Sequence, residues 1–501
     1  MKGVFYLVSE RERERERQYH SYYTMLTYTQ QQQHTYRDPQ TMYRTYYTHY
    51  YPFDAIVRFI TCNKPLEYSP QYRDLRFECL QWSSCSGNNT GAISKHNHWS
   101  KKHFDRRNAA FLRAHIQADL PQSIHISSLI PLRIDPVQFL AVEASPQTMQ
   151  KRKRMAIEYD TATTNNSRSN SADNKFVSPL RESHEADFVH LIPGALKELV
   201  FDIDVPDFHR FCRCTDTTRV EGPSRLLCDT CWLHLEGTYF IMLFVLCHQL
   251  GYARHNVMCV FSGGKGLHFF VNASRAMNLD DTQRLFLHDT LNIRNGSGAQ
   301  TESNGDMALF DWIAQAASRD LSDQLERLFH ETVLVRRNLL VREPGFTRWV
   351  LEKLKRHYPS VHMQVASRWS ELAQMRQNDA DASVVMWSLL KTFEVYRERS
   401  DDSGETRSRV RPTLFLVYRL YYPMIDKMPM KMNHAIKLPF SINAKSGNVS
   451  LPVDAAFIEA SDKATRIVHI EALYDAHRAQ CETPPLFQRG MEILDEWLCH
   501  Y

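Results

Sequence analysis

Two aspartates separated by one residue, Asp202 and Asp204, are the side chains of this sequence best placed to do chemistry. They end the segment ELVFDID, residues 198–204, whose apolar positions predict a buried β-strand. Because successive side chains of a strand point to opposite faces, both carboxylates share one face, and Phe201 and Ile203 pack on the other. Two close carboxylates repel each other unless a cation lies between them. The pair therefore favours a site for a hard divalent cation such as Mg²⁺, and the alternative is an acidic turn that ends a strand.

A glycine-rich turn is a candidate for phosphate binding. The motif SGGKG lies between two predicted strands, 257–261 and 267–271. Glycines let backbone N–H groups approach an anion, and Ser262, Lys265 and His268 add a hydroxyl, a charge and an imidazole. A Walker A loop is excluded, because its lysine would follow the last glycine and a helix would come next. The alternative is a plain β-hairpin with a half-buried histidine.

A third carboxylate and a further lysine lie near the C-terminus, Asp426 in the segment YPMID and Lys437 in NHAIKLPFS. Phosphoryl transfer by two divalent ions needs carboxylates that hold the metals and cations that hold the triphosphate. Asp202, Asp204 and Asp426 supply the carboxylates that such a site requires.

Four of the eleven cysteines, Cys212, Cys214, Cys228 and Cys231, form two close pairs within twenty residues. Four thiolates in two pairs are what a tetrahedral zinc site needs, and they leave no position for water, so the zinc would be structural. The alternative is a set of unconnected buried cysteines. Because no signal peptide precedes them, we expect a reducing compartment and no disulfide framework.

The composition is that of a soluble globular chain of 501 residues, with 43% hydrophobic and 24% charged residues. A net charge of +4 is small for this length, so affinity for a polyanion must come from a local patch. No uninterrupted apolar stretch reaches membrane-spanning length, the longest being 239–246, and we expect no membrane association.

The composition changes along the chain and divides it into segments. Residues 1–41 are of low complexity and predict a disordered tail, and 145–188 read as a flexible linker or insertion. That linker contains the basic run 151–154, which is either a nuclear-import signal or solvated charge. The segments expected to fold are 42–144 as an N-terminal α/β part, 189–279 as a catalytic core with a zinc module near 205–235, 280–410 as a helical subdomain and 411–501 as the C-terminal part of the core.

Within these segments, helical spacing of apolar residues is predicted at 46–56, 104–112 and 486–497, and strands at 75–80 and 414–418.

In their order along the chain, the motifs ELVFDID, the cysteine cluster ending in CDTCW, FSGGKGLH and NHAIKLPFS resemble those of the eukaryotic-type DNA primase small (catalytic) subunit, in the archaeo-eukaryotic primase superfamily. The resemblance runs from about residue 46 to the C-terminal helix and omits the tail and the linker. It implies an α/β (α+β) catalytic core with an RRM-like module, a zinc-binding module and an inserted helical subdomain.

The resemblance also implies a role for each site residue. Carried over by position, the metal-binding catalytic acids are Asp202, Asp204 and Asp426. The residues that hold the phosphates of the incoming nucleotide are Ser262, Lys265, His268 and Lys437, with Arg107 as a further contact.

The implied activity is synthesis of short RNA primers from rNTPs on a single-stranded DNA template, with Mg²⁺ or Mn²⁺ as catalytic ions and structural Zn²⁺. The implied partners are the RNA primer, a large primase subunit and the DNA polymerase alpha complex, and the implied location is the primosome in the nucleus. Two alternatives stay open: a primase-polymerase for damage tolerance, and an inactive zinc-stabilised nucleic-acid-binding scaffold subunit. The position of the cysteines behind the acidic strand argues against the first, and the three acids argue against the second.

The sequence departs from the family pattern at several positions. The glycine turn has one basic residue, Lys265, where the family usually has two, and a lysine replaces a planar guanidinium there. Asn443 stands where a histidine is typical, and 123–127 replace a Lys-x-Asp-x-Gly stretch. We therefore expect a weaker or differently built set of cations around the triphosphate.

Overall fold

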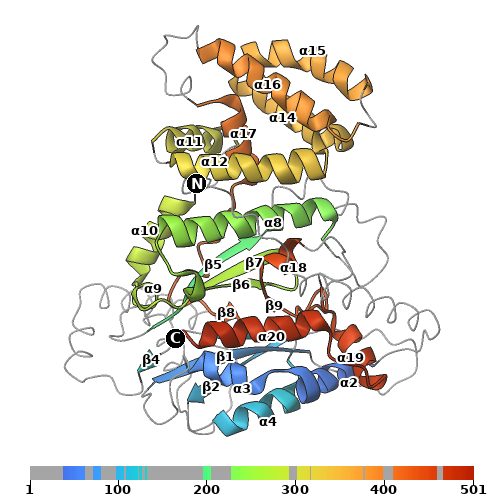
Figure 1. The fold of residues 1–501 in the computed structure, drawn as a ribbon. Coiled ribbons are helices and arrows are strands. Elements are labelled where there is room, and N and C mark those ends of the chain that lie inside the picture. The colour runs from blue at the N-terminus through green and yellow to red at the C-terminus, as the bar shows by residue number, and fades with distance from the viewer. Residues whose placement is uncertain are drawn as a thin grey trace, which may run out of the picture.

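The computed structural model describes residues 38–61, 71–80, 97–105, 109–121, 123–126, 130–131, 196–204, 227–292, 302–315, 317–375, 379–398, 410–459 and 467–500. The predictions made for the tail before residue 38, for the linker 145–188 and for Arg107, Cys212 and Cys214 fall outside these residues. The described part is a mixed helical and sheet structure with two antiparallel sheets and a helical block at one end (Figure 1).

The sheet that carries the acidic strand has the order β5-β7-β6-β9. Its strands are β5 Leu199–Asp204, β6 Val257–Phe261, β7 Gly266–Val271 and β9 Leu451–Val453. The strand, turn and strand predicted around the SGGKG motif are confirmed as β6 and β7, which pair in register from Val257↔Val271 to Phe261↔Leu267. β5 pairs with β7, which places Asp202 opposite His268 and Asp204 opposite Gly266. Asp204, His268 and the turn therefore meet at one end of the sheet.

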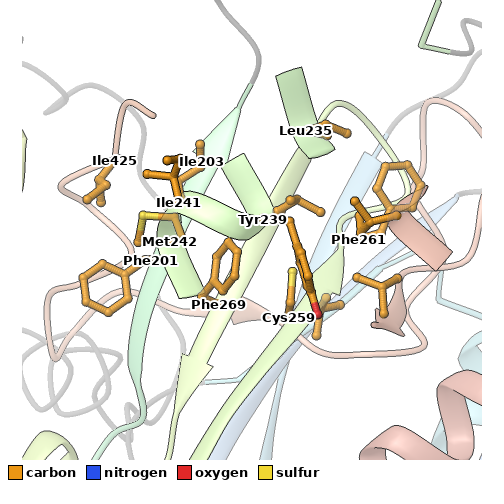
Figure 2. Close-up of a cluster of buried hydrophobic side chains, with 14 of the residues drawn as sticks. Phe201, Ile203, Leu235, Tyr239, Ile241, Met242, Cys259, Phe261, Phe269 and Ile425 are labelled. Atoms are coloured by element: carbon orange, nitrogen blue, oxygen red, sulfur yellow. The ribbon is translucent and has the colours of Figure 1, made fainter. Parts of the chain in front are cut away.

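One face of this sheet is covered by α8 (Asp229–Phe244), which continues into the π-helix η6 (Val245–Gln249). Figure 2 shows Tyr239 and Met242 of the helix packed with Phe201, Ile203 and Phe269 of the strands. In the described part of the chain this is the one helix with the length and hydropathy of a membrane span, over Cys231–Gln249, but 72% of that window is buried. It is the central core helix of the fold.

The opposite face of the sheet is covered by α3 (Phe53–Ile60) and by the C-terminal helix α20 (Pro485–Leu498). Phe59 contacts Phe270 of β7 at 5.8 Å and stacks on Trp497 at 5.4 Å between ring centroids. Because Phe269 and Phe270 are successive residues, they serve the two faces in turn. The helix predicted at 486–497 is confirmed by α20. The helix predicted at 46–56 is only partly right, because the chain leaves helix at residues 51–52, between the π-helix η1 (Tyr46–Tyr50) and α3, and α2 (Pro39–Thr45) precedes η1.

The second sheet has the order β2-β1-β3-β8, and β4 also pairs with β1. Its strands are β1 Gln71–Leu80, β2 Asn97–Asp105, β3 Ser123–Ile126, β4 Ile130–Pro131 and β8 Ile436–Lys437. The strand predicted at 75–80 is confirmed, whereas the helix predicted at 104–112 is only partly right, because β2 ends at Asp105 and α4 spans Ala109–Asp119. β8 comes from the C-terminal part of the chain and places Lys437 opposite His125.

α9 Ser274–Met277 and α10 Asp281–Leu291 lie beside the sheet of β5 (Figure 1). The helical block contains α11 Glu302–Gln315, α12 Arg319–Phe329, η8 His330–Arg336, α13 Leu339–Arg342, α14 Pro344–His357, α15 Pro359–Met375, α16 Ala382–Glu398 and α17 Pro412–Tyr421. The strand predicted at 414–418 is wrong, because these residues lie within α17. A short apolar run cannot by itself distinguish a buried strand from a buried helix. Pro412 occupies the start of the helix, and α17 is packed against α11, α12, α14 and α16, so its apolar residues are buried around most of its circumference.

The remaining C-terminal helices are α18 Ala455–Glu459, which packs on α8, and α19 Ile470–Arg478, which packs on α2 and η1. The two ends of the described chain therefore lie against each other, and the buried Tyr46 hydroxyl donates to the carbonyl oxygen of Phe440 at 2.6 Å.

Candidate active site

Three carboxylates from two separate parts of the chain meet at the end of β5. Asp202 and Asp204 lie on one face of β5, and Phe201 and Ile203 are fully buried on the other, as the alternation predicts. The backbone N–H of Asp426 donates to the carbonyl oxygen of Asp202 at 2.8 Å, in an isolated antiparallel bridge. The third acid is therefore attached to the strand that carries the other two, although 224 residues separate Asp202 from Asp426 in the sequence.

The pKa values of the acids are those expected for carboxylates that lie close together and are shielded from water. Burial, then repulsion from Asp426, raises the pKa of Asp202 to about 7, against an opposing effect of Lys437. Burial and the neighbouring Asp202 also raise the pKa of Asp204. The buried Oδ1 of Asp202 accepts no hydrogen bond from the described residues. A buried carboxylate oxygen without a donor is costly, so this site favours a bound cation or a proton.

These features fit divalent cations, although the acids do not form a finished metal site. Among the residues that the structure describes, no three His, Cys, Asp or Glu side chains are grouped so that they would by themselves hold a metal ion. The carboxylates repel one another, one oxygen of Asp202 lacks a donor among the described residues, and Oδ1 of Asp426 accepts the backbone N–H of Met428 at 3.0 Å. Hard cations take oxygen ligands of this kind and leave positions for phosphate oxygens.

His268 lies on β7 beside the acids. Its Nε2 is 3.3 Å from Oδ1 of Asp202, but the geometry is not that of a hydrogen bond, and Nδ1 has no partner among the described residues. Burial and Lys437 lower the pKa of His268 to about 3, so the ring is neutral at neutral pH. The contact with Asp202 is therefore not an ion pair under those conditions, and one ring nitrogen remains for a ligand.

The glycine turn is held in one conformation by its own serine and by the C-terminal segment. The Ser262 hydroxyl accepts the backbone N–H groups of Gly264 at 3.3 Å and Gly266 at 3.2 Å. Gly263 has φ +74°, and its carbonyl oxygen accepts the Ser446 hydroxyl at 2.6 Å. An added Cβ at Gly266 would lie 2.5 Å from Oδ1 of Asp204, so glycine at this position lets β7 pass beside the acid.

Lys437 lies close to both the turn and the acids, and its role in phosphate binding stays a prediction. Its Nζ donates to the carbonyl oxygen of Ser262 at 3.4 Å, and its charge lowers the pKa values of Asp202 and Asp204. The Asn443 side chain also donates to the Ser262 carbonyl oxygen, at 3.5 Å. The position where the family typically has histidine thus touches the same turn. Lys265 is exposed at the tip of the turn.

Sequence reasoning missed a second group of residues that support the site, Lys197, Arg284, His288, Asn292, Ser446 and Asn448. These polar side chains are all buried or nearly so. Their one signal in the sequence is the spacing of residues 284, 288 and 292, which places polar side chains on one face of a predicted helix.

The described half of the cysteine cluster lies at the start of the core helix α8. Cys228 is the N-cap residue and its sulfur accepts the backbone N–H of Cys231, which is fully buried, at 3.5 Å. The next residue, Trp232, donates from its indole to the carbonyl oxygen of Ile458 at 2.9 Å. Cys212 and Cys214, the other two predicted ligands, and Arg107 lie outside the described residues, so the zinc site and the Arg107 contact stay predictions.

Comparison with known proteins gives the family. The family model for the DNA primase small subunit matches residues 201–455, half of the chain, and includes both acidic segments, the glycine turn and Lys437. The chain belongs to the DNA primase small subunit family.

Individual relatives agree with this assignment. The DNA primase small subunit of Caenorhabditis elegans is 28% identical over 283 residues, 55% of this chain and 64% of the relative. That of Drosophila melanogaster is 25% identical over 306 residues, 58% of this chain and 66% of the relative. The chain thus spans less than two thirds of the length of these relatives. A solved structure, the polymerase domain from Mycobacterium tuberculosis Ligase D in complex with DNA, aligns with 10% identity over 89% of this chain and 93% of that chain, but its TM-score of 0.27 is too low to establish a shared fold.

Proposed function

We propose that this chain is the catalytic subunit of a DNA primase, which joins ribonucleoside triphosphates into short RNA primers on single-stranded DNA during replication. The observation that carries the proposal is the meeting of Asp202, Asp204 and Asp426 beside Lys437 and the glycine turn. Carboxylates next to a phosphate-sized group of donors are what nucleotidyl transfer requires. Family membership supports the same reaction class.

In this proposal the three acids hold Mg²⁺ or Mn²⁺. When bound there, such ions activate the attacking 3′-hydroxyl and neutralise the charge that develops on the triphosphate. The raised pKa of Asp202 favours this role, because a bound cation offsets both causes of the rise, the burial of the carboxylate and its repulsion from Asp426.

The remaining side chains would bind and orient the nucleotide. Lys437, which contacts the turn, and Lys265, which is exposed at its tip, supply positive charges that can each bind a phosphate oxygen. The Ser262 hydroxyl already accepts two backbone N–H groups, which directs its own proton away from the turn towards a ligand. The neutral His268 ring can donate one further hydrogen bond without repelling Lys437.

The same proposal includes a structural Zn²⁺ bound by Cys212, Cys214, Cys228 and Cys231. It also includes a nuclear location and two partners, the large primase subunit and the DNA polymerase alpha complex. They rest on the motif resemblance and on family membership.

Primer synthesis on single-stranded DNA, with rNTPs and Mn²⁺ and with the large subunit present, tests the proposal. The wild type should make short oligoribonucleotides, and Asp202→Asn should lower kcat at least about 100-fold, because it removes a metal ligand while keeping the side-chain size. The matched control is Asp323→Asn, which changes an exposed acid on α12 in the helical block. This variant should keep wild-type activity. A wild type that makes no oligonucleotide would refute the enzyme proposal, and one that extends with dNTPs in preference to rNTPs would favour the primase-polymerase alternative.

A further inference from the structure

The segment between Asp426 and Lys437 carries a site residue at each end. We call residues 425–435 the Asp426 loop. It consists of bends and turns without a helix, and β8 begins directly after it. A segment of this kind has no regular hydrogen-bond ladder, so contacts with the rest of the protein must fix its shape.

Lys197 binds this loop from inside the protein. It is 1% exposed, and its Nζ donates to the carbonyl oxygens of Pro429 at 2.8 Å, His434 at 2.9 Å and Lys431. An ammonium has three N–H donors, one for each of these three carbonyl oxygens. Lys197 directly precedes Glu198 and β5, so it connects the loop to the base of the strand that carries Asp202 and Asp204.

Arg284 of α10 binds both the loop and the same strand. Its side chain is fully buried, and its guanidinium donates to the carbonyl oxygen of Met430 at 3.3 Å, of Glu198 at 3.1 Å and of Lys197 at 2.7 Å. Further carbonyl oxygens bound by the same guanidinium are those of Ala276, Met277 and Leu279. Only a planar group with several fixed donors can bind carbonyls from three segments at once.

Other side chains of α10 hold the two ends of the loop. Asn292, which caps α10, donates to the carbonyl oxygen of Ile425 at 2.9 Å, and Nε2 of His288 lies 3.2 Å from the same oxygen. Asp281 accepts the backbone N–H of Met432 at 2.7 Å. Residues 281, 284 and 288 are three and four positions apart, so one face of the helix supplies these contacts. The Ile425 side chain lies beside Ile203 in the core (Figure 2).

We propose that Arg284 and Lys197 are positioning residues that fix the Asp426 loop, and with it the third carboxylate, against the strand that carries the other two. This inference rests on the proposed function for its catalytic consequence. Both cationic side chains donate to buried backbone carbonyl oxygens. A shorter or neutral side chain would leave these oxygens without hydrogen-bond donors inside the protein. The loop, which precedes Lys437, would then lose the attachment that places Asp426 beside Asp202.

Hydrogen exchange tests whether Lys197 and Arg284 hold the Asp426 loop in place, and it needs no catalytic activity. In Lys197→Met and Arg284→Met, amides of residues 425–435 should exchange at least about 10-fold faster than in the wild type, because their local opening costs less. Lys353→Met is the matched control: Lys353 is also a buried lysine, but it pairs with Asp306 at 2.7 Å in the helical block. This control should lower stability and leave exchange of the Asp426 loop unchanged.

Metal binding and steady-state kinetics test whether the position of the Asp426 loop matters for catalysis. Both loop variants should bind Mn²⁺ about 10- to 100-fold more weakly, measured without nucleotide by electron paramagnetic resonance, as is typical when groups that orient metal ligands are lost. In primer synthesis their kcat should fall by a similar factor, with the KM for rNTPs changed less than about threefold, and a higher Mn²⁺ concentration should restore part of kcat. A purely structural role would not shift the metal dependence.

The inference is overturned if both variants behave like Lys353→Met, losing stability while loop exchange and Mn²⁺ binding stay at wild-type values. If either loop variant does not fold, Asp281→Ala removes the contact with Met432 from a partly exposed position, together with a negative charge near Arg284, and should show the same changes in smaller size. A wild type that makes no primers contradicts the proposed function alone, because loop exchange and Mn²⁺ binding still decide the positioning role.

Discussion

At the scale of single residues, Asp202 connects the chemistry of the site to the stability of the protein. Its pKa is raised to about 7 in the folded chain, mainly by burial and then by Asp426, from an ordinary value of 3.8. Between these two values the folded state binds more protons than the unfolded state. Stability without metal therefore falls as the pH rises from about 4 to about 7, and the full penalty is present above pH 7.

We predict that the metal-free protein is less stable at pH 8 than at pH 5, by at most about 3 kcal/mol from Asp202, because part of the penalty is already present at pH 5. Urea denaturation at the two pH values measures this difference. Asp202→Asn should flatten the pH dependence, since the amide does not titrate, and Mn²⁺ should stabilise the wild type at pH 8. An equal pH dependence in Asp202→Asn and in the control Asp323→Asn would contradict the prediction.

The acids and the turn could be predicted because their signals are local. The alternation of apolar and acidic residues in 198–204 predicts that Asp202 and Asp204 share one face of a strand. The glycines between two strand-forming segments predict the turn. The roles of Lys197 and Arg284 could not be predicted, since their partners are backbone carbonyls that carry no residue identity. Lys197 and Pro429 are 232 residues apart.

At the scale of elements, α8 and α17 show where apolar patterns mislead and where they do not. The apolar run LFLVY favours a strand by its propensity, but packing of α17 against five helices, α8 among them, makes the segment helical. In α8 and η6, polar residues such as Glu236 interrupt the apolar sequence, and the window Cys231–Gln249 that has the hydropathy of a membrane span is 72% buried, in part against β5 and β7. Tertiary contacts settle both cases.

The N-terminus of α8 is also the element at which the zinc proposal can be tested. The purified wild type should contain about one Zn²⁺ per chain, and Cys228→Ser should lose it, because three thiolates and a hydroxyl bind zinc more weakly. Removal of zinc by a chelator should lower Tm, since the metal would fix the start of the core helix.

Cys499→Ser, at the exposed end of α20, is the matched control and should keep the zinc. A wild type without zinc, whose Tm does not respond to a chelator, would show that the cysteine pairs are not a metal site.

At the scale of the whole molecule, the site is shared between the two sheets. The acids Asp202 and Asp204 belong to the sheet of β5, whereas Lys437 belongs to β8 of the other sheet and pairs there with His125. Sequence resemblance placed Lys437 in the site, but the sheet that presents it follows only from the topology, because β8 is two residues long and has no periodic signal.

We predict that Lys437→Met raises the KM for rNTPs about 10- to 100-fold, which corresponds to the loss of one charge-assisted hydrogen bond to a phosphate. Steady-state primer synthesis over a range of rNTP concentrations measures it. Lys445→Met, an exposed lysine in the neighbouring turn, should leave KM unchanged. If both lysine variants raised KM equally, general positive charge and not the position of Lys437 would explain nucleotide affinity.

The contacts of Lys197 with the Asp426 loop also have a consequence for the order of folding. The carbonyl oxygen of Pro429 can reach Nζ only after the chain has closed over 232 residues, and closure of so long a segment carries a large entropic cost that local contacts do not repay. During synthesis from the N-terminus, β5 leaves the ribosome long before residues 425–435 exist. The two strand acids are therefore made early, and their partner arrives only when most of the protein has been translated.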